Sequence, residues 1–238
     1  MKPNQQLETS KKKQVQDMFN AISTEYDFLN KLITFGNIIK WRKKISNIAK
    51  ENSPQNILDV ATGTGDLALE LANIKGAKII GLDISKKMLD IGRKKILNQS
   101  LSDKITLVSG DAENLSYSNN YFDLITIGFG VRNFENLIAG LNESNRVLKE
   151  NGKLIILESS VPKNTIIKFF YLIISRAYVP LLGLLFSKDK LAYRYLQKSA
   201  EKFPSGNTFV EILKDCGFKN IQTKQQMFGA VSIYVAEK

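Results

Sequence analysis

The sequence predicts an α/β fold built on a doubly wound, mainly parallel sheet, and three observations support this prediction. An apolar run at 57–61 is followed by a turn with two glycines and then by a helical pattern at 66–73. Strand-like and helix-like patterns continue to alternate as far as residue 157. After a long apolar segment, a further helical pattern precedes two last strand-like runs, near 220–224 and 230–236.

Residues 1–54 are expected to form an N-terminal helical cap. Apolar residues recur at helical spacing in two parts of it, 10–22 and 37–51, which predicts one helix in each. Pro54 is expected to separate the cap from the first strand, because proline has no backbone N–H to continue a helix.

Residues 55–160 are expected to form the core of a single domain that spans 1–238. The predicted strands are 57–61, 78–83, 105–109, 122–127 and 153–157, with helices at 66–73, 86–99 and 137–148. Ligands of open α/β sheets bind beyond the carboxyl ends of the strands, so a site is expected at that edge.

Residues 161–205 interrupt the alternation, and 166–186 are strongly apolar. This stretch has about the length of a membrane span, but it contains Lys168, Arg176 and Pro180. Two interpretations stay open on the residues alone: two buried helices of the cap, or an apolar lid over a lipophilic substrate that touches the membrane surface. Residues 206–238 hold the last helix, at 208–216, and the two final strands.

Composition excludes several kinds of chemistry. The 238 residues include no histidine, which removes imidazole as a base and makes a zinc or iron site unexpected. The single cysteine, Cys216, rules out an internal disulfide, and residues 1–16 lack the apolar run of a secretory signal, so we expect a cytoplasmic protein. The net charge of +11 is spread along the chain, which favours a solvated lysine-rich surface over a nucleic-acid interface.

The glycine turn predicts a nucleotide-type cofactor. Gly63 and Gly65 permit positive φ and let a ligand lie against bare backbone. Asp59 in the strand and Asp66 after the turn would repel a pyrophosphate, but they would attract a sulfonium cation with its amino group and ribose. The charges therefore favour S-adenosylmethionine over NAD.

Acidic residues also follow the next two strands. Asp83 ends the second strand, where a carboxylate can accept hydrogen bonds from both ribose hydroxyls. Its alternative role is to cap the helix that follows, but Ser85 is better placed for that. Asp111 and Ala112 follow the third strand, where a carboxylate and a backbone amide can recognise the edge of an adenine.

The fourth strand leads into a segment where cofactor and substrate are expected to meet, Gly128-Phe-Gly-Val-Arg-Asn133. Arg132 has two interpretations here. It can lie beside an anionic or enolic oxygen of the substrate, or it can form a surface salt bridge, for example with Glu135. The position beyond the strand favours the first.

The chain resembles the class I S-adenosylmethionine-dependent methyltransferases, and more narrowly the bacterial ubiquinone/menaquinone biosynthesis C-methyltransferases of the demethylmenaquinone methyltransferase group. The resemblance extends from about residue 15 to residue 238. Its most specific parts are the N-terminal Phe…Tyr-Asp…Leu-Asn pattern and the Phe-Gly-Val-Arg-Asn segment. It also includes Leu-Asp-Val-Ala-Thr-Gly-Thr-Gly at 58–65, Gly-Leu-Asp-Ile at 81–84 and Gly-Asp-Ala-Glu at 110–113.

The resemblance implies a class I methyltransferase (Rossmann-like) fold, in which a doubly wound seven-stranded sheet carries an N-terminal helical cap and a helical insertion before the last two strands. Gly128 takes a place where many relatives carry serine, and the C-terminal histidine of many relatives is absent. The resemblance and the residue analysis together predict these cofactor-binding residues: Asp59, Gly63, Thr64, Gly65, Asp83, Ile84, Asp111, Ala112 and Gly128.

The reaction that the resemblance implies is transfer of a methyl group to a ring carbon of a polyprenylated naphthoquinol, which converts demethylmenaquinol to menaquinol. We expect Arg132 to stabilise the oxyanion of the quinol, with Tyr26 and Asn133 orienting its ring. The apolar 166–186 segment then has a use, to enclose the isoprenoid tail.

Alternatives to this reaction stay open. The alternative within the family is that the acceptor is a benzoquinol of ubiquinone biosynthesis. The alternatives outside the family are an RNA or other small-molecule methyltransferase, and a protein that binds the nucleoside without chemistry. No nucleic acid and no metal are expected. Peripheral contact with the inner face of the cell membrane is expected, and a homodimer is left open.

Overall fold

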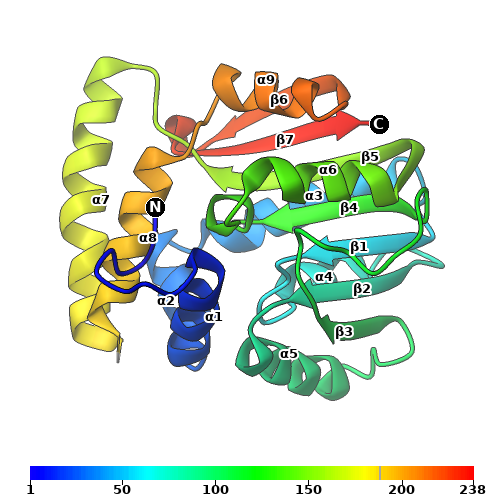
Figure 1. Cartoon of the computed structure of the whole chain (residues 1–238), viewed down its shortest axis with the longest axis horizontal. Helices are drawn as coiled ribbons and strands as arrows, with labels where there is room; N and C mark the ends of the chain where they lie inside the picture. The colour runs from blue at the N-terminus through cyan, green and yellow to red at the C-terminus, as the bar shows by residue number, and fades with distance from the viewer. Residues whose placement is uncertain (188) are drawn as a thin grey trace.

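The computed structural model describes residues 1–187 and 189–238, and a seven-stranded sheet forms its centre (Figure 1). The strand order is β3-β2-β1-β4-β5-β7-β6. β7 is antiparallel to both of its neighbours, and the other neighbouring strands are parallel. The strands are β1 (Asn56–Val60), β2 (Lys78–Asp83), β3 (Ile105–Ser109), β4 (Phe122–Gly128), β5 (Leu148–Ser159), β6 (Lys219–Gln226) and β7 (Val231–Glu237). The predicted doubly wound, seven-stranded sheet is confirmed.

β5 is much longer than the predicted strand at 153–157. It begins at Leu148, where the predicted helix was expected to end, and it reaches Ser159. Residues 153–157 pair with both β4 and β7, and pairing with β7 alone continues the strand through Glu158 to Ser159. The extension carries Glu158 to the edge of the sheet where the site was expected.

Helices cover both faces of the sheet, because consecutive strand residues point to opposite sides. Ile57 of β1 packs in a cluster with α3, α4 and α5, whereas Leu58 packs in a second cluster with α6 and α9. The helices of the core and the C-terminal part are α4 (Asp66–Leu71), α5 (Lys86–Asn98), α6 (Leu137–Val147) and α9 (Asn207–Asp215), with short turns η1 (Val131–Asn133) and η2 (Met227–Gly229).

The N-terminal cap consists of α1 (Lys11–Ile22), α2 (Tyr26–Ile33) and α3 (Asn37–Lys50). α1 and α3 confirm the predicted helices, but α2 lies where no element was predicted. It has only eight residues and no side-chain hydrogen bond at its N-cap, so local signals for it are weak. Packing of the fully buried Leu29 in a cluster with α1, α7 and α8 accounts for its formation.

The apolar insertion is one long helix, α7 (Thr165–Phe186), followed by α8 (Lys190–Lys202). The interpretation as two buried cap helices is wrong, because α7 continues through Pro180 and only 11% of its most apolar window is buried. α7 packs on α8 where Gly183 meets Tyr193: a Cβ added to the glycine would lie 2.5 Å from the Cβ of Tyr193. Both helices stand beside the cap at one end of the sheet (Figure 1). Residue 188, within the predicted lid, lies outside the described residues.

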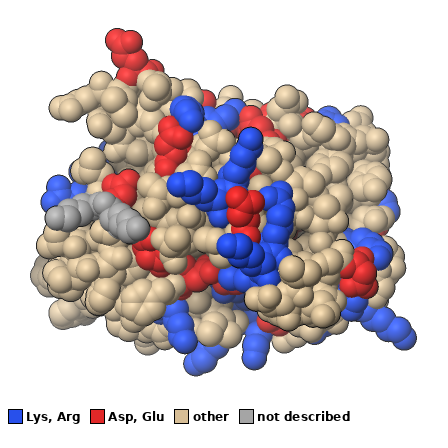
Figure 2. All heavy atoms as spheres, turned by 90° about the horizontal axis from the view of Figure 1, so that it is seen from below, with Lys and Arg blue, Asp and Glu red and all other residues tan. Residues whose placement is uncertain are grey.

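α7 has the length and composition of a helix that crosses a membrane, and no other helix of the described ranges passes this test. Charged residues are distributed differently from the apolar ones. On the face shown in Figure 2, acidic side chains lie among the lysines and arginines. This mixture fits the expected solvated, lysine-rich surface.

Candidate active site

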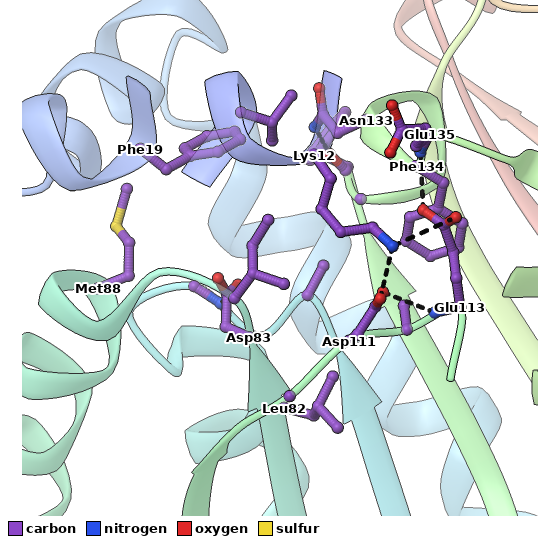
Figure 3. Close-up of a pocket in the computed structure, with 18 of the residues that line it drawn as sticks. Lys12, Phe19, Leu82, Asp83, Met88, Asp111, Glu113, Asn133, Phe134 and Glu135 are labelled. Atoms are coloured by element: carbon purple, nitrogen blue, oxygen red, sulfur yellow. Dashed lines mark hydrogen bonds and ion pairs between the residues drawn. The ribbon is translucent and has the colours of Figure 1, made fainter. Parts of the chain in front are cut away.

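A cavity opens beyond the carboxyl ends of β1, β2, β3 and β4 (Figure 3). Residues from all four strand ends line it, and α1 lies across its mouth. Its lining includes eight predicted site residues: the cofactor-binding candidates Gly63, Asp83, Ile84, Asp111, Ala112 and Gly128, and the catalytic candidates Tyr26 and Asn133. The fold therefore brings eight of the twelve predicted site residues to one cavity.

The glycine turn bends sharply at the end of β1. Gly63 has φ 57° and lines the cavity. Gly65 has φ 78° and is the N-cap of α4; this left-handed conformation favours glycine, whereas space does not require it, since an added Cβ would lie 3.7 Å from the Cα of Gly92. Thr64 is buried, and its hydroxyl donates to Asp27 Oδ1 at 2.6 Å.

The two acidic residues around the turn have different surroundings. Asp59 is buried and accepts hydrogen bonds from the hydroxyls of Thr62 and Thr126, both at 2.6 Å. Burial raises the pKa of Asp59 to about 6, against the lowering effect of those hydrogen bonds. Asp66 is neutralised by Arg42 and Lys95 and does not line the main cavity. Asp59 and Asp66 instead line a smaller neighbouring cavity with Thr64.

Asp83 is placed at the centre of the cavity edge. Its Oδ2 accepts the backbone N–H of Gly63 and its Oδ1 that of Ser85, both at 2.8 Å. Burial raises the pKa of Asp83, and the backbone hydrogen bonds oppose this shift. Ser85 caps α5 by accepting from Met88 N, as predicted, which leaves Asp83 to face the cavity (Figure 3). Ile84 lines the cavity beside it.

Asp111 has a partner that sequence reasoning missed. Lys12 of α1 lies 2.6 Å from Asp111 Oδ2, while Asp111 Oδ1 accepts the N–H of Glu113 (Figure 3). The neighbouring Lys11 donates to the carbonyl oxygens of Arg132 and Phe134. α1 is therefore tied to the strand ends of β3 and β4 by two consecutive lysines.

A second, larger and mainly apolar cavity adjoins the first. It lies between the sheet, the cap and α7, and its walls include Trp41, Phe170, Tyr171, Tyr178 and Phe228. The first cavity holds the carboxylates of Asp83, Asp111 and Glu113 and is called the polar cavity below. Tyr26 and Phe129 line both cavities, so these two rings mark where the polar and the apolar cavity meet.

Arg132 lines the apolar cavity and pairs with Glu158 at 2.5 Å. The alternative of a surface salt bridge with Glu135 is wrong: the side chain of Glu158 is fully buried, and Arg132 is only 10% exposed. The guanidinium also donates to Phe129 O at 2.9 Å. Its Nε is buried and has no hydrogen-bond partner within the described part of the chain.

Asn133 turns toward the polar cavity. Its Oδ1 accepts from the hydroxyl of Tyr195 at 3.2 Å, and its Nδ2 donates to Phe129 O at 3.2 Å. Arg132 and Asn133 thus face adjacent cavities from one short turn. Both support the backbone at Phe129, which lies between them.

Sequence reasoning missed Lys12, Asp27 and Glu158. Lys12 and Asp27 lie in the cap, and nothing in the sequence shows which strand ends the cap covers. Glu158 had a visible signal, because it is a charged residue at the carboxyl end of an apolar strand, as Asp83 is.

Comparison with known proteins gives a consistent result. Residues 7–238 match the ubiE/COQ5 methyltransferase family. The demethylmenaquinone methyltransferase of Bacteroides fragilis is 42% identical over 96% of this chain and 94% of its own length. That of Chlorobaculum tepidum is 40% identical over 98% and 95%. The ubiquinone/menaquinone biosynthesis C-methyltransferase UbiE of Geotalea uraniireducens is 38% identical over 97% and 98%.

Solved structures agree on the fold. A protein of Methanococcus maripaludis described as a putative S-adenosyl-L-methionine-dependent methyltransferase is 22% identical, with a TM-score of 0.60 over 95% of this chain and 93% of its own. A methyltransferase of Bacillus halodurans, also so described, is 23% identical, with a TM-score of 0.57 over 78% and 72%.

Proposed function

We propose that this chain, which belongs to the ubiE/COQ5 methyltransferase family, transfers a methyl group from S-adenosylmethionine to a ring carbon of demethylmenaquinol, giving menaquinol. The observation that carries the proposal is the meeting of a polar cavity and an apolar cavity at Tyr26 and Phe129. A charged nucleoside and a lipid quinol need two such spaces in contact. The names of the relatives from Bacteroides fragilis and Chlorobaculum tepidum support the naphthoquinol as acceptor.

The residues of the polar cavity fit the proposed cofactor. The carboxylate of Asp83 is buried at the edge of the cavity and acts only as a hydrogen-bond acceptor. It could therefore accept hydrogen bonds that two ribose hydroxyls donate. Asp111 and the backbone of Ala112 would hold the base, and Gly63 and Gly128 leave room for the chain of the ligand. When bound, the sulfonium supplies an electrophilic methyl group.

Arg132 is proposed to bind an oxygen of the quinol ring. Its unpartnered Nε is a buried donor, and an unsatisfied buried donor gains when a ligand oxygen accepts from it. Charge that develops on the oxygen as the ring carbon attacks would be stabilised there without reorganisation. Tyr26 and Asn133 would orient the ring between the cavities.

The isoprenoid tail is proposed to occupy the apolar cavity, whose mouth opens toward the membrane surface. α7 exposes a row of large apolar residues: Ile166 is 69% exposed, Phe169 60% and Ile173 51%. Three phenylalanines near this helix are also exposed, Phe28, Phe35 and Phe228. Water rarely covers so continuous an apolar face in a monomer. A cytoplasmic protein held at the inner face of the membrane by α7, beside Lys168 and Arg176, would receive the quinol from the bilayer.

The test of the function is a mass measurement on the purified chain. Incubation with S-adenosylmethionine and reduced demethylmenaquinone is expected to give a product heavier by one CH₂ unit. Demethylated benzoquinol in a parallel reaction distinguishes the alternative acceptor of ubiquinone biosynthesis. Methylation of the benzoquinol alone would contradict the proposed substrate, and methylation of neither would contradict the proposed reaction.

The lipid contact has its own test. The chain is expected to sediment with vesicles of phosphatidylcholine and phosphatidylglycerol. A variant with Ile166, Phe169 and Ile173 changed to serine should bind them at least about tenfold more weakly, because burial of each side chain is worth roughly 1.5–3 kcal/mol. Leu97→Ser, at an exposed position of α5, is the matched control.

Two outcomes would contradict the lipid contact. One is unchanged vesicle binding by the triple variant. The other is a dimer of the unaltered chain, seen by light scattering, that dissociates in the triple variant and excludes vesicles, since α7 would then be covered by a second copy.

A further inference from the structure

A row of five polar side chains joins the glycine turn to four surrounding helices. It begins at the hydroxyl of Thr64 and passes through charges of alternating sign. In order, the members are Thr64, Asp27 of α2, Lys95 of α5, Asp66 of α4 and Arg42 of α3. We propose that Asp27 is a positioning residue, which through this row holds α2, and with it Tyr26, closed over the cofactor turn.

The distances support a continuous row. Thr64 Oγ1 donates to Asp27 Oδ1 at 2.6 Å, and Asp27 Oδ2 lies 2.6 Å from Lys95 Nζ. The same ammonium lies 2.5 Å from Asp66 Oδ1. Arg42 Nη1 then reaches Asp66 Oδ2 at 2.6 Å. Asp27 is thus the one member of the row that belongs to α2, and both of its oxygens are engaged.

Tyr26, the neighbour of Asp27, lies directly on the glycine turn. Its Cε1 is 3.9 Å from the place that a Cβ on Gly63 would take, which is van der Waals contact. Its ring lines both the polar and the apolar cavity. Movement of α2 away from the turn would carry Tyr26 with it and open the cofactor space to solvent.

α2 depends on such contacts for its position. A helix of eight residues is not stable alone, and this one has no side-chain cap at its N-terminus. The four charged side chains of the row are only partly buried, with exposed fractions from 19% for Arg42 to 34% for Asp27, so salt screens their attraction. The row can therefore release α2 as well as hold it.

This inference rests on the proposed cofactor, but not on the methyl acceptor, so binding of S-adenosylmethionine alone tests it. Asp27→Asn keeps the shape and loses the charge toward Lys95. It is expected to raise the Kd by roughly tenfold, as loss of a charge-assisted contact does, with a matching rise in the dissociation rate. In turnover the change should fall on KM for S-adenosylmethionine more than on kcat.

Three companions complete the experiment. Thr64→Val should raise the Kd in the same way, and Thr64→Ser, which keeps the hydroxyl, should restore most of the affinity. Asp90→Asn breaks the exposed pair with Arg93 on α5 and should leave binding unchanged. Hydrogen exchange provides a second measurement: in Asp27→Asn with bound cofactor, the amides of Tyr26–Ile33 should lose protection while those of α5 keep it.

Unchanged dissociation of the cofactor from Asp27→Asn, with unchanged protection of α2, would overturn the inference. Absence of binding to the unaltered chain would instead contradict the proposed function. If Asp27→Asn does not fold, the inference is tested by varying the salt concentration with the unaltered chain. Hydrogen-exchange protection of α2 should then fall as NaCl is raised from about 0.05 to about 0.5 M, because salt screens partly exposed ion pairs. Constant protection would overturn the inference.

Discussion

Arg132→Gln is expected to lower kcat for methyl transfer by about 10²- to 10³-fold, as loss of one oxyanion-stabilising donor does. The physical reason is that Glu158 and Phe129 O hold the guanidinium in place before the substrate arrives, and its buried Nε has no partner among the described residues. Cofactor affinity should stay within about twofold, because Arg132 does not line the polar cavity.

The measurements for Arg132 are kcat with a short-tailed demethylnaphthoquinol and Kd for S-adenosylmethionine by calorimetry. Arg132→Lys keeps the positive charge without the Nε donor, so it should recover only part of the rate. Arg93→Gln, at an exposed arginine of α5, is the control for loss of a basic residue. Full turnover by Arg132→Gln would show that the oxyanion is stabilised elsewhere.

Local sequence signals predicted well which strand ends line the polar cavity. The turn at Gly63 follows from residues of the unit β1–α4, and the carboxylate of Asp83 and the cap at Ser85 follow from those of the unit β2–α5. The rule that ligands bind beyond the carboxyl ends of parallel strands then brought Asp111 to the same cavity. Each of these predictions needed only the order of elements along the chain.

The parts that the sequence did not reveal depend on contacts between distant segments. Asp66 has the right spacing for a place beside the cofactor, yet Arg42 and Lys95 neutralise it from α3 and α5. α2 has too few residues for a clear helical pattern and forms by packing of Leu29. Whether α7 is buried or exposed cannot be read from its composition, because an apolar helix fits a core, a bilayer or an interface between them.

Glu158→Ala is expected to lower the free energy of unfolding by about 3–5 kcal/mol, because it leaves the guanidinium of Arg132 buried without its counter-charge. Urea unfolding followed by circular dichroism measures this change. Glu158→Gln, which keeps a hydrogen-bond acceptor for Arg132, should lose less. A loss below about 1 kcal/mol in Glu158→Ala would mean that water reaches the ion pair. The attraction of Glu158 would then be too weak to hold Arg132 in place.

The double variant Arg132→Met, Glu158→Leu separates stability from function. Replacement of both members of a buried ion pair by apolar residues of similar volume is often neutral or stabilising, so this protein should unfold at a urea concentration near that of the unaltered chain. It should nevertheless transfer methyl groups as poorly as Arg132→Gln. A stable but inactive double variant would mean that the fold does not need the buried pair. The presence of Arg132 in the wall of the apolar cavity would then be explained by the chemistry that it performs there.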